Sequence, residues 1–391
     1  MANSTDLPSA SSPTLVLAHP TAAERRATWT LNSKSWGAAL SLEDYIERET
    51  HLAEIPPTID GGVTHWILTE SSLPPDARPI YSASESLRRR TFVCFPGGEV
   101  TEGITHGIGS VFSPPAYRGR GYAARMLTLL GPVLNTWQKE VGESHFSILY
   151  SDIGKKYYTG FGWPPFASKH ISLPAASLSS TNGVNGHKPE EAKLLYADDL
   201  KELCDLDEGY LRTEVAARTK TTRKPSVAII PDHLTMTWHH LREQFMCTKL
   251  FPTRAPPTIH GAISSGALGS RIWIIFSRVF YGPLSDPKSG NNLYILRLVA
   301  EDAAAADTEE NARRLKSVLE IAQGEAKEWG VGGVSVWNVS DAVKTLLQRT
   351  GLQYTTVDRE SESIASLMWY GEGRGDVESV EWVGNEKYAW C

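Results

Sequence analysis

The run ITHGIGSVFSPPAYRGRGYAA, residues 104–124, constrains the fold of this chain more than any other segment. Ile108–Phe112 is a short apolar stretch of strand-forming residues, and Pro114 and Pro115 end it. A turn rich in glycine and arginine follows. Apolar residues then recur on one face of a helix: Met126, Leu130, Val133, Leu134 and Trp137. The run therefore predicts a strand, a glycine-rich turn and a helix in succession.

This arrangement predicts an anion site at the start of the helix. The free N–H groups of a first helical turn and the positive end of the helix dipole both face the turn. Gly119 and Gly121 have no Cβ, so a ligand can approach their backbone closely, and Arg118 and Arg120 supply bidentate donors suited to phosphate. The expected ligand is a pyrophosphate. The spacing is neither that of a dinucleotide-binding fingerprint nor that of a P-loop.

A second stretch lies about thirty residues further on, SHFSILYSDIGKKYYTGFGW at residues 144–163. It predicts a strand over Phe146–Tyr150, a cap at Ser151 or Asp152, and one short helix before Gly160. The two stretches together give the order strand, glycine-rich turn, long helix, strand and short helix.

The first stretch resembles the acetyl-coenzyme A loop of the GNAT acetyltransferase superfamily, whose signature Gln/Arg-x-x-Gly-x-Gly/Ala is matched by Arg118, Gly121 and Ala123. The second resembles the superfamily's F-Y-x-x-x-G-F motif, with Tyr157 and Trp163 in place of phenylalanines. Both stretches are also similar to the fungal lysine Nε-acetyltransferases of lysine catabolism. The resemblance through motifs covers roughly residues 14–175.

The resemblance implies an α/β fold in which a central mixed sheet is flanked by helices, with acetyl-coenzyme A as the cosubstrate. Backbone groups of Val111 and Phe112 would hold the pantetheine arm, and the loop Arg118–Ala123, which includes Tyr122, would hold the pyrophosphate. Tyr158 would protonate the leaving thiolate, and Trp36 and Tyr45 would contact the acceptor. The implied reaction is direct acetyl transfer to the ε-amine of free L-lysine. Another amine (protein lysine, aminoglycoside or polyamine) and a non-catalytic coenzyme A sensor remain as alternatives.

Two residues are candidates for the base that this reaction needs, because a lysine amine has an unperturbed pKa of about 10.4. His106 lies two residues before Ile108, on the same face of the predicted strand. The α-carboxylate of Cys391 is the second candidate, since some two-domain relatives bring the chain terminus into the active site. An edge strand of the second domain is the alternative for this apolar C-terminal segment.

The predicted domains are a disordered leader (1–13), a catalytic GNAT domain (14–178), a linker (179–191) and a degenerate GNAT-like domain (192–391). The polar composition of AASLSSTNGVNGHKPEE, residues 175–191, indicates the linker. After it, strands at 272–281 and 293–300, a helix at 309–329 and a strand at 333–339 repeat the plan of the first domain. Glu301 and Asp302 stand where a phosphate would bind and would repel it, so this copy is expected not to bind coenzyme A.

Composition excludes several other classes of protein. The net charge of −6 argues against a general nucleic-acid binder. The four cysteines are scattered, and His239 and His240 are adjacent and would diverge on a helix, so no metal is expected. No stretch has the length of a membrane span, and the first residues lack the pattern of a secretory signal. A cytoplasmic enzyme with a small-molecule amine as partner is expected, in an oligomeric state that stays open.

Overall fold

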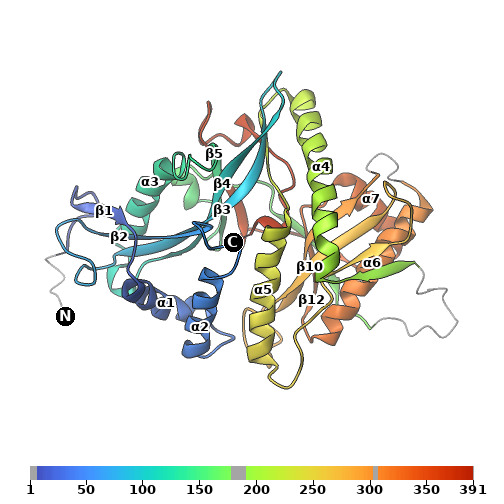
Figure 1. The fold of residues 1–391 in the computed structure, drawn as a ribbon, viewed down its shortest axis with the longest axis horizontal. Coiled ribbons are helices and arrows are strands. Elements are labelled where there is room, and N and C mark those ends of the chain that lie inside the picture. The colour runs from blue at the N-terminus through green and yellow to red at the C-terminus, as the bar shows by residue number, and fades with distance from the viewer. Residues whose placement is uncertain (1–6, 178–190, 303–306, 391) are drawn as a thin grey trace.

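The computed structural model describes residues 7–177, 191–302 and 307–390, and Figure 1 shows their arrangement. The helices are α1 (Ala22–Trp36), α2 (Leu42–Ala53), α3 (Tyr122–Leu134), α4 (Ala197–Thr222), α5 (His233–Leu250), α6 (Glu309–Glu328) and α7 (Asp341–Thr350). The short 3-10 turns are η1 (Pro115–Tyr117), η2 (Tyr158–Phe161), η3 (Val377–Ser379) and η4 (Lys387–Ala389).

Fifteen strands form two sheets among the described residues. The strands of the first sheet are β1 (Leu15–Ala18), β2 (Val63–Glu70), β3 (Ser82–Cys94), β4 (Val100–Phe112), β5 (Ser144–Ser151), β8 (Ser226–Ile229), β14 (Ile364–Trp369) and β15 (Glu381–Trp382). Those of the second are β6 (Lys169–Pro174), β7 (Ala192–Leu195), β9 (Gly261–Ser264), β10 (Ile272–Val279), β11 (Asn292–Ala300), β12 (Gly333–Trp337) and β13 (Thr355–Asp358).

The first sheet is mixed, in the order β1-β2-β3-β4-β5-β14, and only the β4–β5 pair of this path is parallel. Helix α3 connects these two strands, as parallel neighbours require a crossover. Helix α3 covers one face of the sheet, and α1 and α2 lie on the other (Figure 1). In the second sheet β11 and β12 are also parallel and are connected by α6. The predicted fold class, α/β with a central mixed sheet flanked by helices and a second α/β unit, is confirmed.

The two sheets exchange strands across the predicted domain boundary. Strand β6, from the segment assigned to the first domain, pairs with β12 and β13 in the second sheet. Conversely, β14 pairs with β5, and β8 pairs with β3, so the C-terminal half completes the first sheet. The helices α4 and α5 run between the two sheets (Figure 1). No single position in the chain therefore separates the strands of the first sheet from those of the second.

Local sequence explains where several helices begin. Thr21 accepts a hydrogen bond from the backbone N–H of Glu24, and the Glu24 side chain accepts one from the N–H of Thr21, so a capping box begins α1. Ser41 caps α2 through the N–H of Asp44.

Helix α3 packs on the first sheet through the face that its sequence predicts. Met126, Leu130 and Leu134 are fully buried, and Leu127 joins them. Pro132 lies within the last turn of the helix, which ends at Leu134, as expected for a residue that cannot donate a backbone hydrogen bond.

Part of the segment predicted as a disordered leader contacts this domain. The Tyr122 hydroxyl donates a 2.6 Å hydrogen bond to the Pro8 carbonyl, and Leu7 and Ala10 pack against the cluster that contains Tyr122. Residues 1–6, all but the last residue of the predicted linker, and Cys391 lie outside the described residues.

Candidate active site

Strands β4 and β5 separate at their C-terminal ends, as a slot for an extended ligand requires. They pair from Ile104 with Ser144 to Ile108 with Leu149. Beyond that point β4 continues to Phe112 beside β3, and β5 continues to Ser151 beside β14. The backbone of Gly109–Val111 therefore faces the opening without a partner on β5.

A bulge in β4 lies at this separation. The β3–β4 register shifts between Ala83, which pairs with Phe112, and Glu85, which pairs with Gly109. Ser110, inside the bulge, has φ of 54°, a left-handed conformation that is uncommon for a residue other than glycine. Of the two residues predicted to hold pantetheine, Val111 lies in the bulge. The Phe112 carbonyl already accepts a 2.9 Å hydrogen bond from Ser82 Oγ.

The predicted pyrophosphate loop leads from β4 into α3. Gly119 and Gly121 have φ of 74° and 82°, so both need the conformational freedom of glycine, and Gly121 is the N-cap of α3. The first-turn amides of Tyr122 and Ala123 have no acceptor within the helix. Arg118 and Arg120 are exposed, and the Arg118 guanidinium lies over the Phe112 ring, 5.1 Å from its centroid. The loop fits a pyrophosphate because backbone donors and two cations surround an open approach.

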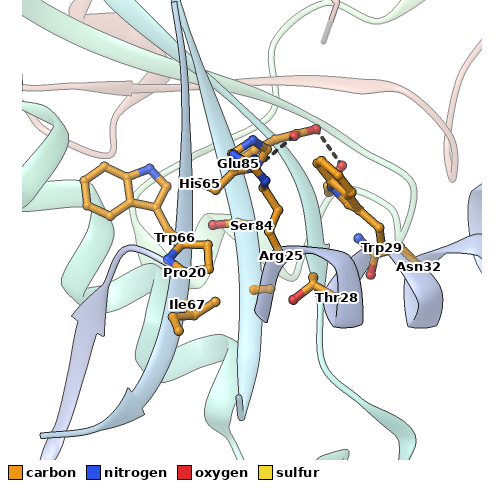
Figure 2. Close-up of a pocket in the computed structure, with 12 residues that line it drawn as sticks. Pro20, Arg25, Thr28, Trp29, Asn32, His65, Trp66, Ile67, Ser84 and Glu85 are labelled. Atoms are coloured by element: carbon orange, nitrogen blue, oxygen red, sulfur yellow. Dashed lines mark hydrogen bonds and ion pairs between the residues drawn. The ribbon is translucent and has the colours of Figure 1, made fainter. Parts of the chain in front are cut away.

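A pocket opens on the opposite side of the sheet from α3, beside the bulge. Figure 2 shows Arg25, Trp29 and Asn32 entering it from α1, with His65 and Glu85 on the neighbouring strands β2 and β3. The cavity itself measures about 20 Å³, and the rest of the space between its lining atoms opens towards solvent. The other lining residues are Pro20, Thr28, Trp66, Ile67, Ala83, Ser84 and Ser110.

Glu85 is the carboxylate of this pocket. Its Oε1 accepts a 2.7 Å hydrogen bond from Ser110 Oγ, and its Oε2 lies 3.6 Å from His65 Nδ1 (Figure 2). Burial and the negative charge of Glu49 raise the pKa of Glu85 to about 7, although the Ser110 hydrogen bond opposes the shift. Burial and the nearby Arg25 cation lower the pKa of His65 to about 4, so His65 is neutral near pH 7. Glu85 is thus poised to exchange a proton near neutral pH.

Tyr158 lies at the start of η2 and is half-buried against the cluster formed by α3 and the first sheet. Its hydroxyl has no hydrogen-bond partner among the described residues. Burial raises the pKa of Tyr158 well above its ordinary value, so the phenol keeps its proton near neutral pH. This is the protonation state that a general acid needs.

His106 does not line this pocket. It shares a strand face with Ile108, as predicted, but this is the face that α3 covers. Its ring is fully buried, and Nε2 lies 3.2 Å from Gln138 Oε1, just after α3. Burial lowers the pKa of His106 to about 4. The periodicity of the strand predicts that His106 and Ile108 share a face, but it does not predict that α3 covers this face.

The two predicted acceptor residues lie around the pocket rather than in it. Trp36 ends α1, and its ring lies 6.1 Å from the Phe112 ring, next to the bulge. Tyr45 is buried in α2 beneath the Arg48 guanidinium, which is 4.5 Å from the centroid of its ring.

The C-terminal segment packs between the two halves of the chain. Trp390 belongs to the cluster that contains Leu87 of β3 and Trp238 of α5, and its ring lies 3.7 Å from Lys387 Nζ. Cys391, the other predicted base, falls outside the described residues. The segment also contains the short strand β15, which pairs with β8 in the first sheet.

Sequence reasoning missed Arg25, Asn32, His65 and Glu85. The segment SASESL, residues 82–87, alternates small polar residues with Ala83, Glu85 and Leu87, and this period of two is a strand signal that would have placed Glu85 and Leu87 on one face. Helical spacing within α1 would likewise have grouped Arg25, Trp29 and Asn32. Within the described ranges, no group of three or more His, Cys, Asp or Glu residues could hold a metal, and no helix is long and apolar enough to cross a membrane.

Comparison with solved structures supports the fold. Over 91% of this chain, it is similar to a probable N-acyltransferase of Enterococcus faecalis V583 and to a GCN5-related N-acetyltransferase of Anabaena variabilis. Both comparisons have a TM-score of 0.50 and cover 72% of the other chain, with sequence identities of 14% and 13%.

Two curated proteins are similar over nearly their whole length. A "Lysine acetyltransferase" of Yarrowia lipolytica is 25% identical over 94% of this chain and 97% of its own. An uncharacterized protein of Saccharomyces cerevisiae is 24% identical over 94% of this chain and 95% of its own. A family model described as "LYC1 GNAT-like C-terminal domain" matches residues 170–391, which is more than half of the chain. With the strand separation, the glycine loop and this match in agreement, the chain belongs to the LYC1-like family of GNAT acetyltransferases.

Proposed function

We propose that this acetyltransferase uses acetyl-coenzyme A to acetylate the ε-amine of free L-lysine. The name of the Yarrowia lipolytica relative supports lysine as the acceptor. The loop Arg118–Ala123 supports binding of the pyrophosphate, and the separated ends of β4 and β5 support a pantetheine slot. The observation that carries the proposal is the Glu85 carboxylate, hydrogen-bonded by Ser110 at the bulge where this slot begins.

In this mechanism Glu85, rather than His106, is the general base. Its pKa of about 7 leaves a substantial fraction ionised at neutral pH, and it is basic enough to accept a proton as the amine attacks. A backbone N–H of the bulge at Val111 would stabilise the negative charge that develops on the thioester oxygen. Tyr158 would donate its proton to the departing thiolate. No acyl-enzyme is needed, because both reactants are held together.

The alternatives are weaker on chemical grounds. A sensor that only binds coenzyme A has no use for an ionisable carboxyl beside the bulge or for a protonated Tyr158. Protein lysines would need an open groove, whereas this pocket is small and lies beneath α1. The buried, free thiols of Cys94, Cys204 and Cys247 are consistent with our further proposal that the enzyme works in the reducing cytoplasm.

The test is turnover of acetyl-coenzyme A with purified protein, measured as thiol release, with the product identified by mass spectrometry. The acceptors are free L-lysine, polyamines, an aminoglycoside and histone peptides. Free lysine should give the highest kcat/KM. Glu85→Gln should lower kcat/KM about 10²–10⁴-fold, the loss typical of a removed base. Glu99→Gln, an exposed carboxylate in the β3–β4 turn, is the matched control and should match wild type. A preferred peptide or polyamine would replace lysine, and full activity of Glu85→Gln would remove Glu85 from the mechanism.

A further inference from the structure

The pocket beside Glu85 contains polar side-chain atoms that have no hydrogen-bond partner and no role in the proposed acetyl transfer. Among the described residues, Arg25 Nε, Asn32 Oδ1 and His65 Nε2 are buried without any hydrogen-bond partner, and all three residues line the pocket. Asn32 is only 2% exposed. A buried polar atom without a partner costs free energy, so folded proteins retain few of them. Together these three atoms supply hydrogen-bonding groups for a polar ligand.

These groups come from one face of α1. Arg25, Trp29 and Asn32 are spaced four and three residues apart, so they form one stripe along the helix, and Figure 2 shows this stripe entering the pocket. The guanidinium of Arg25 lies 5.1 Å from the centroid of the Trp29 ring, which holds it in place. The stripe faces His65 and Glu85 across the pocket.

Arg25 has no carboxylate partner, whereas Arg78, which contacts the same end of α1, has one. Arg78 donates two hydrogen bonds, of 2.8 and 2.9 Å, to the Glu24 carboxylate at the start of the same helix. No ion pair or hydrogen bond joins the Arg25 side chain to another described residue. A guanidinium kept unpaired inside a pocket is suited to the carboxylate of a ligand.

The polar groups of the pocket match those of a free diamino acid. A guanidinium binds an α-carboxylate, an amide oxygen accepts a hydrogen bond from an α-ammonium, and the Glu85 carboxyl receives the side-chain amine next to the bulge. A peptide has neither a free α-carboxylate nor an α-ammonium at an internal lysine. A polyamine has no carboxylate.

We propose that Arg25 and Asn32 bind the α-carboxylate and the α-ammonium of the acceptor, and so select a free amino acid over peptides and polyamines. This inference rests on the proposed function and adds the residues that determine its specificity. Arg25 and Asn32 do not touch the reacting atoms. Their loss should therefore raise KM more than it lowers kcat.

The experiment compares L-lysine with lysinamide, in which an amide replaces the carboxylate, with Nα-acetyl-lysine, which has no α-ammonium, and with cadaverine, which has no carboxylate but keeps a second ammonium. Wild type should prefer lysine to lysinamide by about 10–100-fold in kcat/KM, the range expected for one charged hydrogen-bonded contact. Arg25→Ala should abolish this preference, and Arg25→Lys should restore part of it. Asn32→Ala should abolish the preference for lysine over Nα-acetyl-lysine. Arg26→Ala, the exposed neighbour on α1, should retain both preferences.

The outcomes separate this inference from the proposed function. Equal turnover of lysine, lysinamide and cadaverine by wild type would overturn head-group recognition and leave acetyl transfer intact. Equal losses on all four amines in Arg25→Ala would assign Arg25 a structural role and overturn the inference. If no amine is acetylated, the proposed function fails. Calorimetry with lysine then decides the inference, which stands if lysine binds wild type but not Arg25→Ala, and falls if neither protein or both bind it.

Discussion

Ser110 Oγ donates a 2.7 Å hydrogen bond to Glu85 Oε1, and this contact joins the bulge of β4 to the neighbouring strand β3. It places an ionisable carboxyl beside the backbone that would hold the thioester. The left-handed backbone of Ser110, with φ of 54°, lies at the same point. Strain of this kind persists when the surroundings impose it, and here it coincides with the proposed reaction centre.

The first prediction concerns the dependence of activity on pH. A base works only when deprotonated, so kcat/KM should fall as the pH drops below about 7, the pKa of Glu85. The Ser110 hydrogen bond lowers this pKa, so Ser110→Ala should move the falling limb to higher pH. Steady-state kinetics from pH 5 to 9 will measure both curves. A limb that stays in place in Ser110→Ala would show that another group titrates.

The second prediction concerns stability. Between its unfolded pKa, near 4.5, and its folded pKa, near 7, Glu85 keeps a proton in the native protein that the unfolded chain releases. The native state therefore loses stability as the pH rises through this window, and the penalty is complete above it. Glutamine carries no charge at any pH, so Glu85→Gln should melt at a higher temperature than wild type at pH 8. The difference should shrink towards pH 4.5. Equal melting temperatures at pH 8 would mean that burial of the ionised Glu85 carboxylate does not destabilise the native protein.

The third prediction tests the pyrophosphate loop. Gly121 has φ of 82°, and a Cβ added there would lie 3.3 Å from the Cβ of Ala10. Gly121→Val should therefore distort the start of α3 and abolish acetyl-coenzyme A binding, measured by calorimetry. Gly209→Ala, at an open position within α4, serves as the control and should bind normally. A folded Gly121→Val protein with wild-type affinity would disprove the loop assignment.

The fourth prediction tests the general acid. Tyr158→Phe removes only the hydroxyl, so kcat should fall about 10²–10⁴-fold while affinity for coenzyme A stays near that of wild type. Tyr157→Phe changes the adjacent, more exposed hydroxyl and should keep its activity. Should Tyr157→Phe lose activity and Tyr158→Phe keep it, the role belongs to Tyr157.

The sequence predicts the parts of this site that depend on neighbouring residues. The glycines of the turn Arg118–Ala123 and the apolar periodicity of the residues after it predict a turn and a helix, and the structure has both. The start of α1 follows from Thr21 and Glu24. These features are predictable because the interacting residues are within a few positions of each other in the chain.

The features that the sequence does not predict depend on distant partners. Strand β14 pairs with β5 across more than two hundred residues of chain, and nothing in its six residues specifies that partner. Glu85 gains its raised pKa from burial and Glu49, and its hydrogen bond from Ser110, 25 residues away. His106 was placed on the correct strand face relative to Ile108, but only tertiary packing determines that α3 covers this face.

The last prediction concerns the ion pairs that hold the C-terminal segment on the second sheet. Arg297 of β11 donates hydrogen bonds of 2.7 and 2.8 Å to Asp207 of α4, and it also pairs with Glu386 of the C-terminal segment. Glu386 further accepts a 3.1 Å hydrogen bond from the N–H of Leu298. Asp207 is 1% exposed, and burial raises the pKa of Glu386 to about 7 in spite of Arg297.

Replacing Arg297 with an uncharged side chain of similar size should destabilise the protein. The buried carboxylates of Asp207 and Glu386 would then lie close together without a positive charge to balance them. Arg297→Met should lower the free energy of unfolding by about 3–5 kcal/mol at pH 7, measured by urea denaturation. Arg218→Met, on the exposed face of α4, should change it by no more than about 0.5 kcal/mol. The loss in Arg297→Met should diminish as the pH falls, since protonated carboxyls no longer need the cation. A loss that is equal at pH 5 and pH 8 would mean that the packing of Arg297, rather than its charge, holds the C-terminal segment in place.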